Sequence, residues 1–357
     1  MRLLPLSLIL ACTPPVMSDE PGTAGSTGAV GSTSGTSGAA PTSSGEEAGS
    51  TGEASTGAPI EGLRLNELQA MGTHNSYHVS PGPSVKDLDY THRPLPEQLD
   101  NGARKFELDV HFNQPGEPID VYHLEVLDMG STCPQLGVCM QQLRDWSDAH
   151  PGHHLLYVMI EVKTPYNQIL VDDLFVTLEQ EILSAWPRER VLAPDDVQGD
   201  AADLRAGLAE RGWPSIEATR GKLLVVLHDD GFWRDRYVLN GTGGRLLFPD
   251  AFGDLELPFA AVHTLNDPVG DAAKIAEVVD AGHIVRTRAD ADNVEPLAGD
   301  TARAEAALAS GATFISTDYP PPKGEIDYVF EIPGGTPSRC NPRTAPADCT
   351  AAMIESL

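Results

Sequence analysis

The sequence predicts an α/β fold of the distorted (β/α)8, or TIM-barrel, type. Eight apolar runs with the length of buried strands follow residue 60, and amphipathic stretches separate several of them. Polar and charged residues come directly after most of these runs, as expected where parallel strands end at the functional rim of a barrel. The chain has 357 residues, a length that one such barrel fits.

The expected strands and helices alternate along the chain. The strands are predicted at residues 65–71, 105–110, 119–122, 155–160, 222–227, 259–263, 283–286 and 313–316. The helices are predicted at residues 95–103, 140–150, 171–186, 271–281 and 300–310, with a further one around Leu204–Arg211. We find no internal repeat and no second core of comparable size, so the barrel is expected to be the single folded domain.

Composition divides the chain into four segments. Residues 1–12 resemble a bacterial signal peptide that ends in a lipobox-like Ile9-Leu10-Ala11-Cys12; because the apolar run is short, a truncated or misassigned start is the alternative. Residues 13–59 are rich in Gly, Ser and Thr and contain no basic residue, which predicts a disordered tether. Residues 60–332 are the predicted barrel, and residues 333–357 are a predicted disulfide-stapled tail. We therefore expect export, with a lipid anchor to the bacterial cell envelope at Cys12 or otherwise secretion.

The chain is strongly acidic. It carries 24 Lys and Arg against 52 Asp and Glu, which gives a formal net charge of −28. This balance argues against a nucleic-acid partner, because a phosphate backbone attracts basic surfaces. It argues equally against electrostatic docking on an anionic membrane. An anionic substrate is still possible if a metal cation neutralises the site locally.

The cysteines predict disulfides. Without Cys12, four remain, at positions 133, 139, 340 and 349, and an even number in an exported protein favours two bridges. Three connectivities are possible, and the simplest joins Cys133 to Cys139 and Cys340 to Cys349. A zinc site is less favoured, because neither pair has the short spacing of a zinc knuckle.

Acidic and amide side chains cluster at the ends of three predicted strands. Asn75 follows the first strand, Glu107 and Asp109 alternate along the second, and Glu161 ends the fourth. Carboxylates repeated over neighbouring apolar strands are costly to bury unless a cation pairs with them. Because all four side chains offer oxygen, the set predicts a hard cation, calcium in preference to magnesium. The structural alternative is a buried salt-bridge network with Arg104, Lys105 or Lys163.

Three histidines are candidates for acid–base chemistry beside this cluster. His74 lies at the end of the first strand and His123 at the end of the third, and each titrates near neutral pH in its ordinary state. His111 competes with His123 for the second role, because strand alternation places it on the same face as Glu107 and Asp109.

Six segments resemble the phosphatidylinositol-specific phospholipase C superfamily, most closely its bacterial calcium-dependent branch. The resemblance extends from about residue 65 to residue 320 and excludes the tether and the tail. The segments that carry it are Gly72-Thr73-His74-Asn75-Ser76-Tyr77, Phe106-Glu107-Leu108-Asp109-Val110-His111, Tyr122-His123, Ile160-Glu161-Val162-Lys163, residues 284–290 and residues 309–320.

The resemblance implies a TIM-barrel enzyme, a single catalytic domain that cleaves the phosphodiester between inositol and diacylglycerol. His74 corresponds to the histidine that stabilises charge on phosphorus and helps in proton transfer, and His123 to the one that protonates the leaving group. The 2-hydroxyl of inositol would then attack within the same molecule and give a cyclic inositol phosphate.

The resemblance also implies the metal and the partners. Asn75, Glu107, Asp109 and Glu161 match calcium ligands, and the retained acids distinguish the chain from the branch in which an arginine replaces the metal. Lys163 and Arg286 match phosphate or inositol contacts more loosely. The expected substrate is an inositol phospholipid at a membrane surface, and the expected state is a monomer.

Two other functions compete with this prediction. A glycerophosphodiester phosphodiesterase is also a metal-dependent barrel, but its first motif reads His-Arg-Gly where this chain has His74-Asn75-Ser76. A surface lipoprotein that binds inositol lipids or glycans without turnover is the second alternative. The presence of both His74 and His123 argues against the second, because such relatives usually lack a catalytic histidine.

Overall fold

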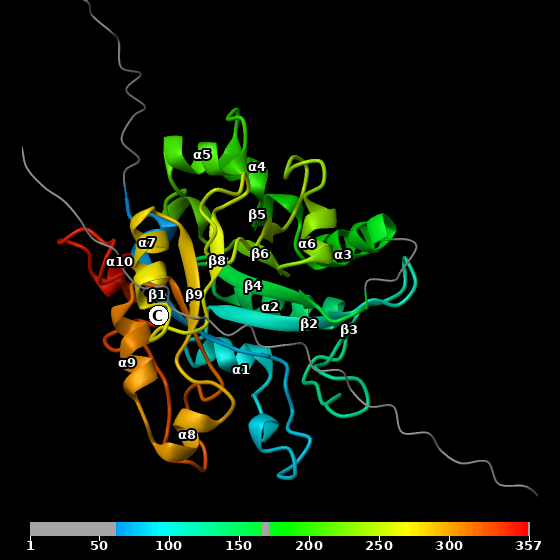
Figure 1. Cartoon of the computed structure of the whole chain (residues 1–357), viewed down its shortest axis with the longest axis vertical. Helices are drawn as coiled ribbons and strands as arrows, with labels where there is room; N and C mark the ends of the chain where they lie inside the picture. The colour runs from blue at the N-terminus through cyan, green and yellow to red at the C-terminus, as the bar shows by residue number, and fades with distance from the viewer. Residues whose placement is uncertain (1–61, 166–170, 356–357) are drawn as a thin grey trace, which may run out of the picture. The chain divides into compact units, whose positions relative to one another are not determined.

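The computed structural model describes residues 62–165 and 171–355. Within these residues a ring of parallel strands forms the centre of the molecule (Figure 1). Each strand pairs with the next around the ring, and the isolated parallel bridge between Asp250 and Val262 joins β7 to β8. β10 returns to β1 in register Ala70 with Phe314, so the ring closes. In ring order the strands are β1 (Leu68–Thr73), β2 (Lys105–His111), β4 (Leu156–Val162), β6 (Leu223–His228), β7 (Phe248–Pro249), β8 (Val262–Thr264), β9 (Ile284–Arg288) and β10 (Phe314–Thr317).

The predicted α/β barrel is thereby confirmed, with one strand assigned wrongly and one missed. The sequence predicts the third barrel strand at residues 119–122, and this is wrong. These residues contain β3 (Asp120–Val121), a short strand that pairs antiparallel with the end of β2 outside the ring. The eighth ring position belongs to β7, which has two residues and so shows no periodicity that a sequence pattern could reveal.

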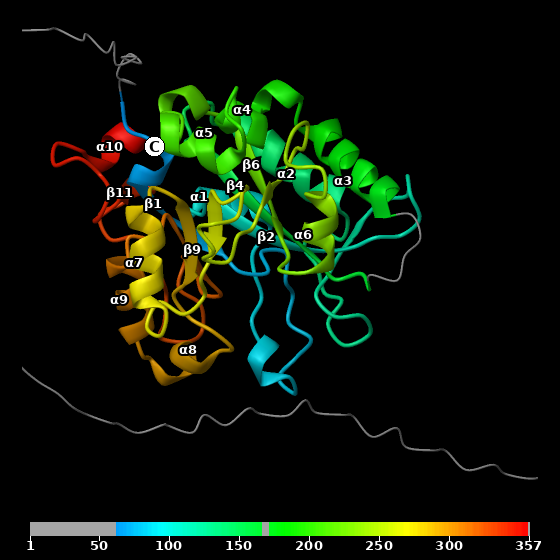
Figure 2. The same cartoon turned by 45° about the horizontal axis from the view of Figure 1, so that its top comes forward.

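Helices pack around the outside of the ring in Figures 1 and 2. The longest, α2 (Leu136–Ala149) and α3 (Val171–Ala185), bury apolar faces that share a core with the outward-facing residues of β2, β4 and β6. The other helices are α1 (Leu95–Asp100), α4 (Pro194–Gln198), α5 (Leu204–Arg211), α6 (Phe232–Tyr237), α7 (Ala272–Asp280), α8 (Val294–Ala298), α9 (Ala302–Ala309) and α10 (Ala351–Ile354). The remaining elements are β5 (Val191–Leu192), β11 (Arg339–Cys340) and the 3-10 turns Leu65–Glu67, Lys86–Leu88, Arg188–Arg190 and Glu217–Thr219.

Strand alternation sorts β2 into two faces. Phe106, Leu108 and Val110 pack in the outer core beneath the helices. The alternate residues face the other way, so Glu107 and Asp109 lie on the interior face of the barrel together with Lys105. Tyr157 and Met159, which pair with Lys105 and Glu107 in register, belong to a second, interior core. The barrel interior is therefore apolar at its amino-terminal end and charged at its carboxyl-terminal end.

A glycine brings the first two strands together. β1 and β2 pair at Gly72 and Lys105. A Cβ atom at position 72 would lie 2.5 Å from Cβ of Lys105, which no side chain can satisfy without movement of the backbone. Gly72 thus allows the strand that carries His74 to approach the strand that carries the acids.

The tail closes the amino-terminal end of the barrel. β11 pairs antiparallel with the start of β1, and disulfides join Cys340 to Cys349 and Cys133 to Cys139, the pairing that the spacing predicts. Glu355 accepts hydrogen bonds from the guanidinium of Arg104, which is itself fully buried. α10 lies at the end opposite to α8 and to the loops that follow β1 and β3 (Figures 1 and 2).

The signal peptide, the lipobox cysteine and the tether predicted at residues 1–59 lie outside the described residues. Among the residues that are described, no helix combines the length and apolar character needed to cross a membrane.

Candidate active site

His74 stands at the carboxyl end of β1, held between a carboxylate and an arginine. Its Nδ1 lies 2.9 Å from Oδ1 of Asp318, and the Tyr90 hydroxyl lies 3.3 Å from the same nitrogen. Burial and the neighbouring Arg288 lower the pKa of His74, although Asp318 opposes them. Burial alone would raise the pKa of Asp318, but His74 and Arg288 outweigh it and hold that pKa well below its usual range. Because Asp318 is ionised, Nδ1 carries the proton and Nε2 is left as the basic nitrogen.

Arg288 connects the same carboxylate to the outer nitrogen of His74. It donates to Oδ2 of Asp318 at 2.8 Å, and its second terminal nitrogen lies 3.5 Å from Nε2 of His74. Asp290 supports Asp318 from behind, since its carboxylate accepts from the backbone N–H of Asp318 and from the hydroxyl of Thr317. This places the guanidinium of Arg288 beside Nε2 of His74.

Glu107 is buried next to two cations. Lys105 Nζ and an Arg286 terminal nitrogen each lie 2.6 Å from Oε2 of Glu107. Burial alone would raise the pKa of Glu107, but Arg286 and Lys105 outweigh it and hold the pKa well below normal. Burial and the adjacent Arg286 in turn lower the pKa of Lys105 to about 7. The salt bridge that the sequence offers as an alternative therefore exists for Lys105, and both cations contact the same oxygen of Glu107.

Asp109 and Glu161 face each other across β2 and β4 and share Lys163. Asp109 pairs with Glu161 in register, and Nζ of Lys163 lies 3.1 Å from Oδ2 of Asp109 and also bonds Oε1 of Glu161. Burial, followed by repulsion from Glu161, raises the pKa of Asp109 well above its ordinary value, although Lys163 opposes the shift. Among the described residues, neither buried carboxylate oxygen of Asp109 accepts a well-formed hydrogen bond, and Lys163 is the cation that pairs with Oδ2.

The incomplete hydrogen bonding of Asp109 and the proximity of Glu161 show that the residues fit a bound cation. A buried carboxylate without hydrogen-bond donors is costly, and a hard divalent ion is the partner that would compensate for it. Asn75, the fourth predicted ligand, is buried immediately after His74 with a positive φ of 42°, a conformation that asparagine tolerates better than most residues. Arg104, the other cation that the sequence offers as a partner, is absent from this cluster because it bonds Glu355.

His123 is oriented by a buried aspartate that the sequence does not single out. Nδ1 of His123 lies 3.0 Å from Oδ2 of Asp128, and Nε2 of His78 lies 2.9 Å from the same oxygen. The other nitrogen of His78 faces the carbonyl of Tyr90 at 3.0 Å, so His78 is fixed on both sides. Burial lowers the pKa of His123, and the hydrogen bond with Asp128 opposes that effect.

His111 has a different environment from the other two histidines. Its ring stacks on Tyr122 at a centroid distance of 3.7 Å, and its Nε2 lies 3.0 Å from the Tyr122 carbonyl oxygen. The ion pairs found for His74 with Asp318 and for His123 with Asp128 have no counterpart at His111 in the described part of the chain. His111 holds the turn that leads from β3 to His123.

Tyr90, in the loop between β1 and α1, connects His74 to His78. Tyr90 contacts His78 through its carbonyl and His74 through its hydroxyl, and its ring lies 4.4 Å from that of His78. His92 donates from Nε2 to the His74 carbonyl at 2.8 Å, and burial lowers its pKa to about 4. A chain of contacts thus runs from Asp318 to Asp128 through residues of one loop.

His228 adds a nitrogen to the acidic cluster. It ends β6 opposite Glu161, and ligand-capable atoms of Glu107, Glu161 and His228 all lie within 4.8 Å of one another. Nδ1 of His228 lies 2.8 Å from Oδ2 of Asp250. Burial alone would lower the pKa of His228, but the hydrogen bond with Asp250 outweighs it and raises the pKa.

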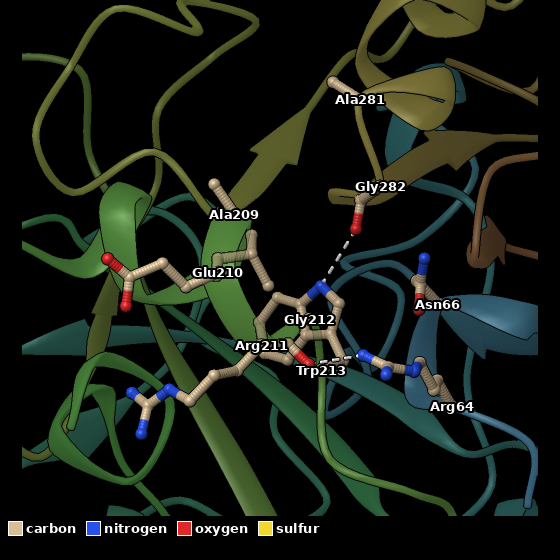
Figure 3. Close-up of a pocket in the computed structure, with 10 residues that line it drawn as sticks. Arg64, Asn66, Ala209, Glu210, Arg211, Gly212, Trp213, Ala281 and Gly282 are labelled. Carbon is tan, nitrogen blue, oxygen red and sulfur yellow. Dashed lines mark hydrogen bonds between the residues drawn. The ribbon is translucent and has the colours of Figure 1, made fainter. Parts of the chain in front are cut away.

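A hollow of about 340 Å³ lies elsewhere, at the amino-terminal end of the barrel (Figure 3). Arg64, just before β1, lines it together with the ends of α5 and α7. The Arg64 guanidinium donates to the Arg211 carbonyl, and the Trp213 indole N–H donates to the Gly282 carbonyl at 3.1 Å. None of the predicted site residues lines this hollow, so it is separate from the candidate active site.

The residues that sequence reasoning missed are those that support the predicted ones. They are Asp318, Arg288, Tyr90, His92, Asp128, His78, His228 and Asp250. Asp128 offered one signal, an acid between the apolar residues Leu127 and Met129. The contact of Asp318 with His74 joins residues 244 positions apart, and that of Asp250 with His228 joins residues 22 positions apart, so neither pairing can be read from a local pattern.

The family is decided by a match to a sequence model. The family of calcium-dependent phosphoinositide phospholipases C matches residues 63–118 and 111–342. The chain belongs to this family. The chain is therefore a phosphodiesterase of the phospholipase C type, and the rival predictions are not favoured.

Solved structures agree with the fold. A calcium-dependent phosphatidylinositol-specific phospholipase C from Streptomyces antibioticus is 20% identical, with a TM-score of 0.54 over 72% of this chain and 95% of that one. A calcium-dependent phosphoinositol-specific phospholipase C from a Gram-negative Pseudomonas species, in the apo form with myo-inositol, is 17% identical. Its TM-score is 0.55 over 72% of this chain and 91% of that one. A comparison with curated proteins gives no match.

Proposed function

We propose that the protein cleaves phosphatidylinositol in a calcium-dependent reaction to diacylglycerol and a cyclic inositol phosphate. The observation that carries the proposal is a pair of histidines, each held by a buried carboxylate, beside the acids Glu107, Asp109 and Glu161, of which the first two are buried. Acid–base groups next to a cation site are what transfer of a phosphoryl group within one molecule requires.

Calcium is the proposed cofactor. Asn75, Glu107, Asp109 and Glu161 would hold it, since hard cations prefer carboxylate and amide oxygens. When bound, the ion lowers the pKa of the inositol 2-hydroxyl and offsets the negative charge that develops on the phosphate. Magnesium suits the site less, because it demands near-ideal octahedral geometry and gives up its water reluctantly.

The two histidines have complementary roles in the proposal. His74 accepts the proton of the 2-hydroxyl at Nε2, and the oxygen then forms a bond to phosphorus as the bond from phosphorus to the diacylglycerol oxygen breaks. His123 donates a proton from Nε2 to that leaving oxygen. We prefer His123 to His111 for this step because Asp128 directs its Nδ1, whereas His111 is bound to the Tyr122 carbonyl.

Lys163 and Arg286 remain proposed contacts to phosphate or inositol. Lys163 is 23% exposed at its side chain and is therefore within reach of a substrate. Arg286 is buried and bonded to Glu107, Ser316 and Asn266, which favours a role in positioning the acids. Arg288, close to Nε2 of His74, is a further candidate for the phosphate contact.

A membrane surface is the proposed location of the substrate. The hairpin that follows His123 exposes Val126 at 84%, Leu127 at 70% and Met129 at 53%. The short helix α8, which follows β9, exposes Val294 and Leu297 at the same end of the molecule (Figures 1 and 2). Exposed apolar groups at the rim of a site suit a lipid substrate, and the net charge of −28 favours apolar over electrostatic docking.

Export, with anchoring at Cys12 or otherwise secretion, and a monomeric state complete the proposal. Export and the anchor are inferred from the amino-terminal sequence, and labelling of the full chain with a radioactive fatty acid in a bacterial host would test the anchor. Loss of label in Cys12→Ser is expected, and label that persists in this variant contradicts the anchor.

Cleavage of phosphatidylinositol by the full chain, with calcium and then with excess chelator, tests the central proposal. We expect diacylglycerol and a cyclic inositol phosphate only when calcium is present. His74→Ala should reduce turnover by at least about 100-fold, because acid–base catalysis typically supplies that much, while leaving calcium binding intact. His150→Gln, at an exposed position at the end of α2, is the control. Near-normal activity in His74→Ala, or activity that the chelator leaves unchanged, would contradict the proposal.

A further inference from the structure

We propose that His228 is a nitrogen ligand of the metal centre. With Glu107 and Glu161 it forms a mixed oxygen and nitrogen site that takes a first-row divalent cation such as Mn²⁺ as well as calcium. The inference deepens the proposed function and rests on it for the position of the metal. It adds a ligand type that the all-oxygen set predicted from the sequence does not contain.

The three side chains converge from neighbouring strands. Glu107 comes from β2, Glu161 from β4 and His228 from β6, and His228 pairs directly with Glu161 in register. One ligand atom of each lies within 4.8 Å of the others. Two ligands of one ion at bond lengths of roughly 2.1–2.4 Å can be at most about 4.8 Å apart, so these separations are compatible with one cation shared by all three.

The tautomer of His228 leaves Nε2 available. Its Nδ1 is 2.8 Å from Oδ2 of Asp250. That carboxylate is fixed in turn, because Oδ2 accepts from the Thr264 hydroxyl and Oδ1 accepts from the backbone N–H groups of Phe252 and Thr264. With Nδ1–H committed to Asp250, the lone pair is on Nε2. Metal-binding histidines typically show this arrangement, in which a carboxylate orients the ring and increases its basicity.

A separate observation indicates that the cluster accepts a cation. Asp109, which pairs with Glu161 in register, is fully buried, and within the described residues neither of its carboxylate oxygens accepts a well-formed hydrogen bond. Lys163 compensates this charge in part, at 3.1 Å from Oδ2. Lys105 and Arg286 both contact Oε2 of Glu107, which leaves Oε1 outside those two contacts.

The nitrogen changes which cations the site can hold. Calcium prefers oxygen ligands throughout, whereas imidazole increases affinity for first-row transition metals. Mn²⁺ accepts carboxylates readily and binds imidazole as well, which makes it the appropriate probe. His228 should therefore contribute more to Mn²⁺ affinity than to calcium affinity.

The test is Mn²⁺ binding to the full chain, followed by electron paramagnetic resonance. Pulsed spectra of the bound ion should show coupling to a nitrogen-14 nucleus, and His228→Gln should remove it. We expect His228→Gln to weaken Mn²⁺ binding at least about tenfold, and Asp250→Asn to weaken it about tenfold with the coupling retained. Calcium affinity, measured by calorimetry, should change less in both variants. His150→Gln is the matched control, because His150 lies at the end of α2 and contacts Trp146 instead of the acidic cluster.

Several outcomes would overturn the inference. They are bound Mn²⁺ without nitrogen coupling in the unmodified protein, coupling that persists in His228→Gln, and an absence of Mn²⁺ binding. The unmodified protein decides the first and third by itself, and His228→Asn replaces His228→Gln if the latter does not fold. Cleavage of phosphatidylinositol with calcium is measured in a separate assay. An active enzyme whose bound Mn²⁺ shows no nitrogen coupling therefore contradicts this inference alone. Nitrogen-bound Mn²⁺ in a protein that cleaves no inositol lipid defeats the proposed function alone.

Discussion

Asp128 is the residue whose position most directly sets the behaviour of a proposed catalytic group. Its Oδ2 contacts both His123 and His78, and its side chain is buried. Because His78 is bound at its other nitrogen by the Tyr90 carbonyl, the carboxylate cannot turn away from His123 without breaking a second contact. We infer that Asp128 is a positioning residue that keeps Nε2 of His123 directed outward.

Asp128→Asn should therefore shift the pH dependence of cleavage. Burial lowers the pKa of His123 and Asp128 opposes it, so removal of the negative charge lowers that pKa further. Since the leaving-group acid must be protonated, activity falls as pH rises through this pKa, and the alkaline limb should move to lower pH. At pH 7 we expect kcat to fall roughly 10- to 100-fold, a part of what general acid catalysis supplies.

Profiles of kcat against pH for the unmodified protein, Asp128→Asn and Glu125→Gln check this expectation. Glu125 is exposed in the same hairpin and serves as the control. A purely structural role of Asp128 would lower activity equally at every pH, so an alkaline limb that stays in place rules out the positioning role.

At the level of single residues, the sequence predicts the groups that react better than the groups that hold them. Alternation along β2 correctly places Glu107 and Asp109 on the interior face, because strand periodicity is local. Asp318 lies 244 positions from the His74 that it contacts, and only the return of β10 to β1 brings them together. Such pairs arise from closure of the ring, which no window of sequence contains.

The hairpin after β3 is the element that differs most from an ordinary surface loop. Leu124 and Asp128 pair antiparallel through backbone hydrogen bonds of 3.0 and 2.9 Å, and Val126 at the tip has a φ of 70°. A β-branched residue rarely adopts this left-handed conformation, so the turn is held in it by its surroundings. The same element carries exposed apolar side chains outward and the buried Asp128 inward.

Charged residues at the hairpin tip should weaken membrane binding while leaving the chemistry intact. Burial of a Val or Leu side chain contributes about 1.5–3 kcal/mol, so the double variant Val126→Asp/Leu127→Asp should bind phosphatidylcholine vesicles containing phosphatidylinositol at least about tenfold more weakly. Turnover of a soluble, short-chain phosphatidylinositol should be nearly unchanged. Aspartate also tolerates a positive φ better than valine, which protects the fold.

Vesicle sedimentation and soluble-substrate assays on the same preparations provide the measurement. Val176→Asp, at a half-exposed position on the outer face of α3, is the control and should bind vesicles normally. Equal vesicle binding by the double variant and the unmodified protein would exclude the hairpin as a membrane contact.

Among the elements, long periodic ones are predicted from sequence and short ones are not. Leu204–Arg211 is predicted with its observed bounds, and α3 differs from its prediction by one residue. β7 and β3 have two residues each, so their roles depend on neighbours: β7 is fixed by pairing with β6, and β3 by pairing with the end of β2. A two-residue strand contains no repeat for a pattern to detect.

Across the whole molecule, several buried histidines remain uncharged. Burial is the largest cause in each case, and it lowers the pKa of His154 and His263 to about 3 and that of His92, His153 and His283 to about 4. They lie at both ends of the barrel, since His154 is next to the tail through Ser338 while His92 supports the His74 carbonyl. Their protonation therefore couples the active-site end and the tail end to global stability.

Acid should consequently unfold the protein before most carboxylates titrate. The folded pKa values of these five histidines lie below the unfolded value of about 6.5, so the unfolded chain binds protons first as pH falls. Their stabilising contribution is complete above about pH 6.5 and is lost as pH falls from there toward 4. The free energy of unfolding, measured with urea between pH 7.5 and 5, should decrease by more than about 1.4 kcal/mol per pH unit. His154→Gln should reduce this slope, whereas His150→Gln should not. A free energy that is constant or rises over this interval contradicts the assignment of these histidines as buried and neutral.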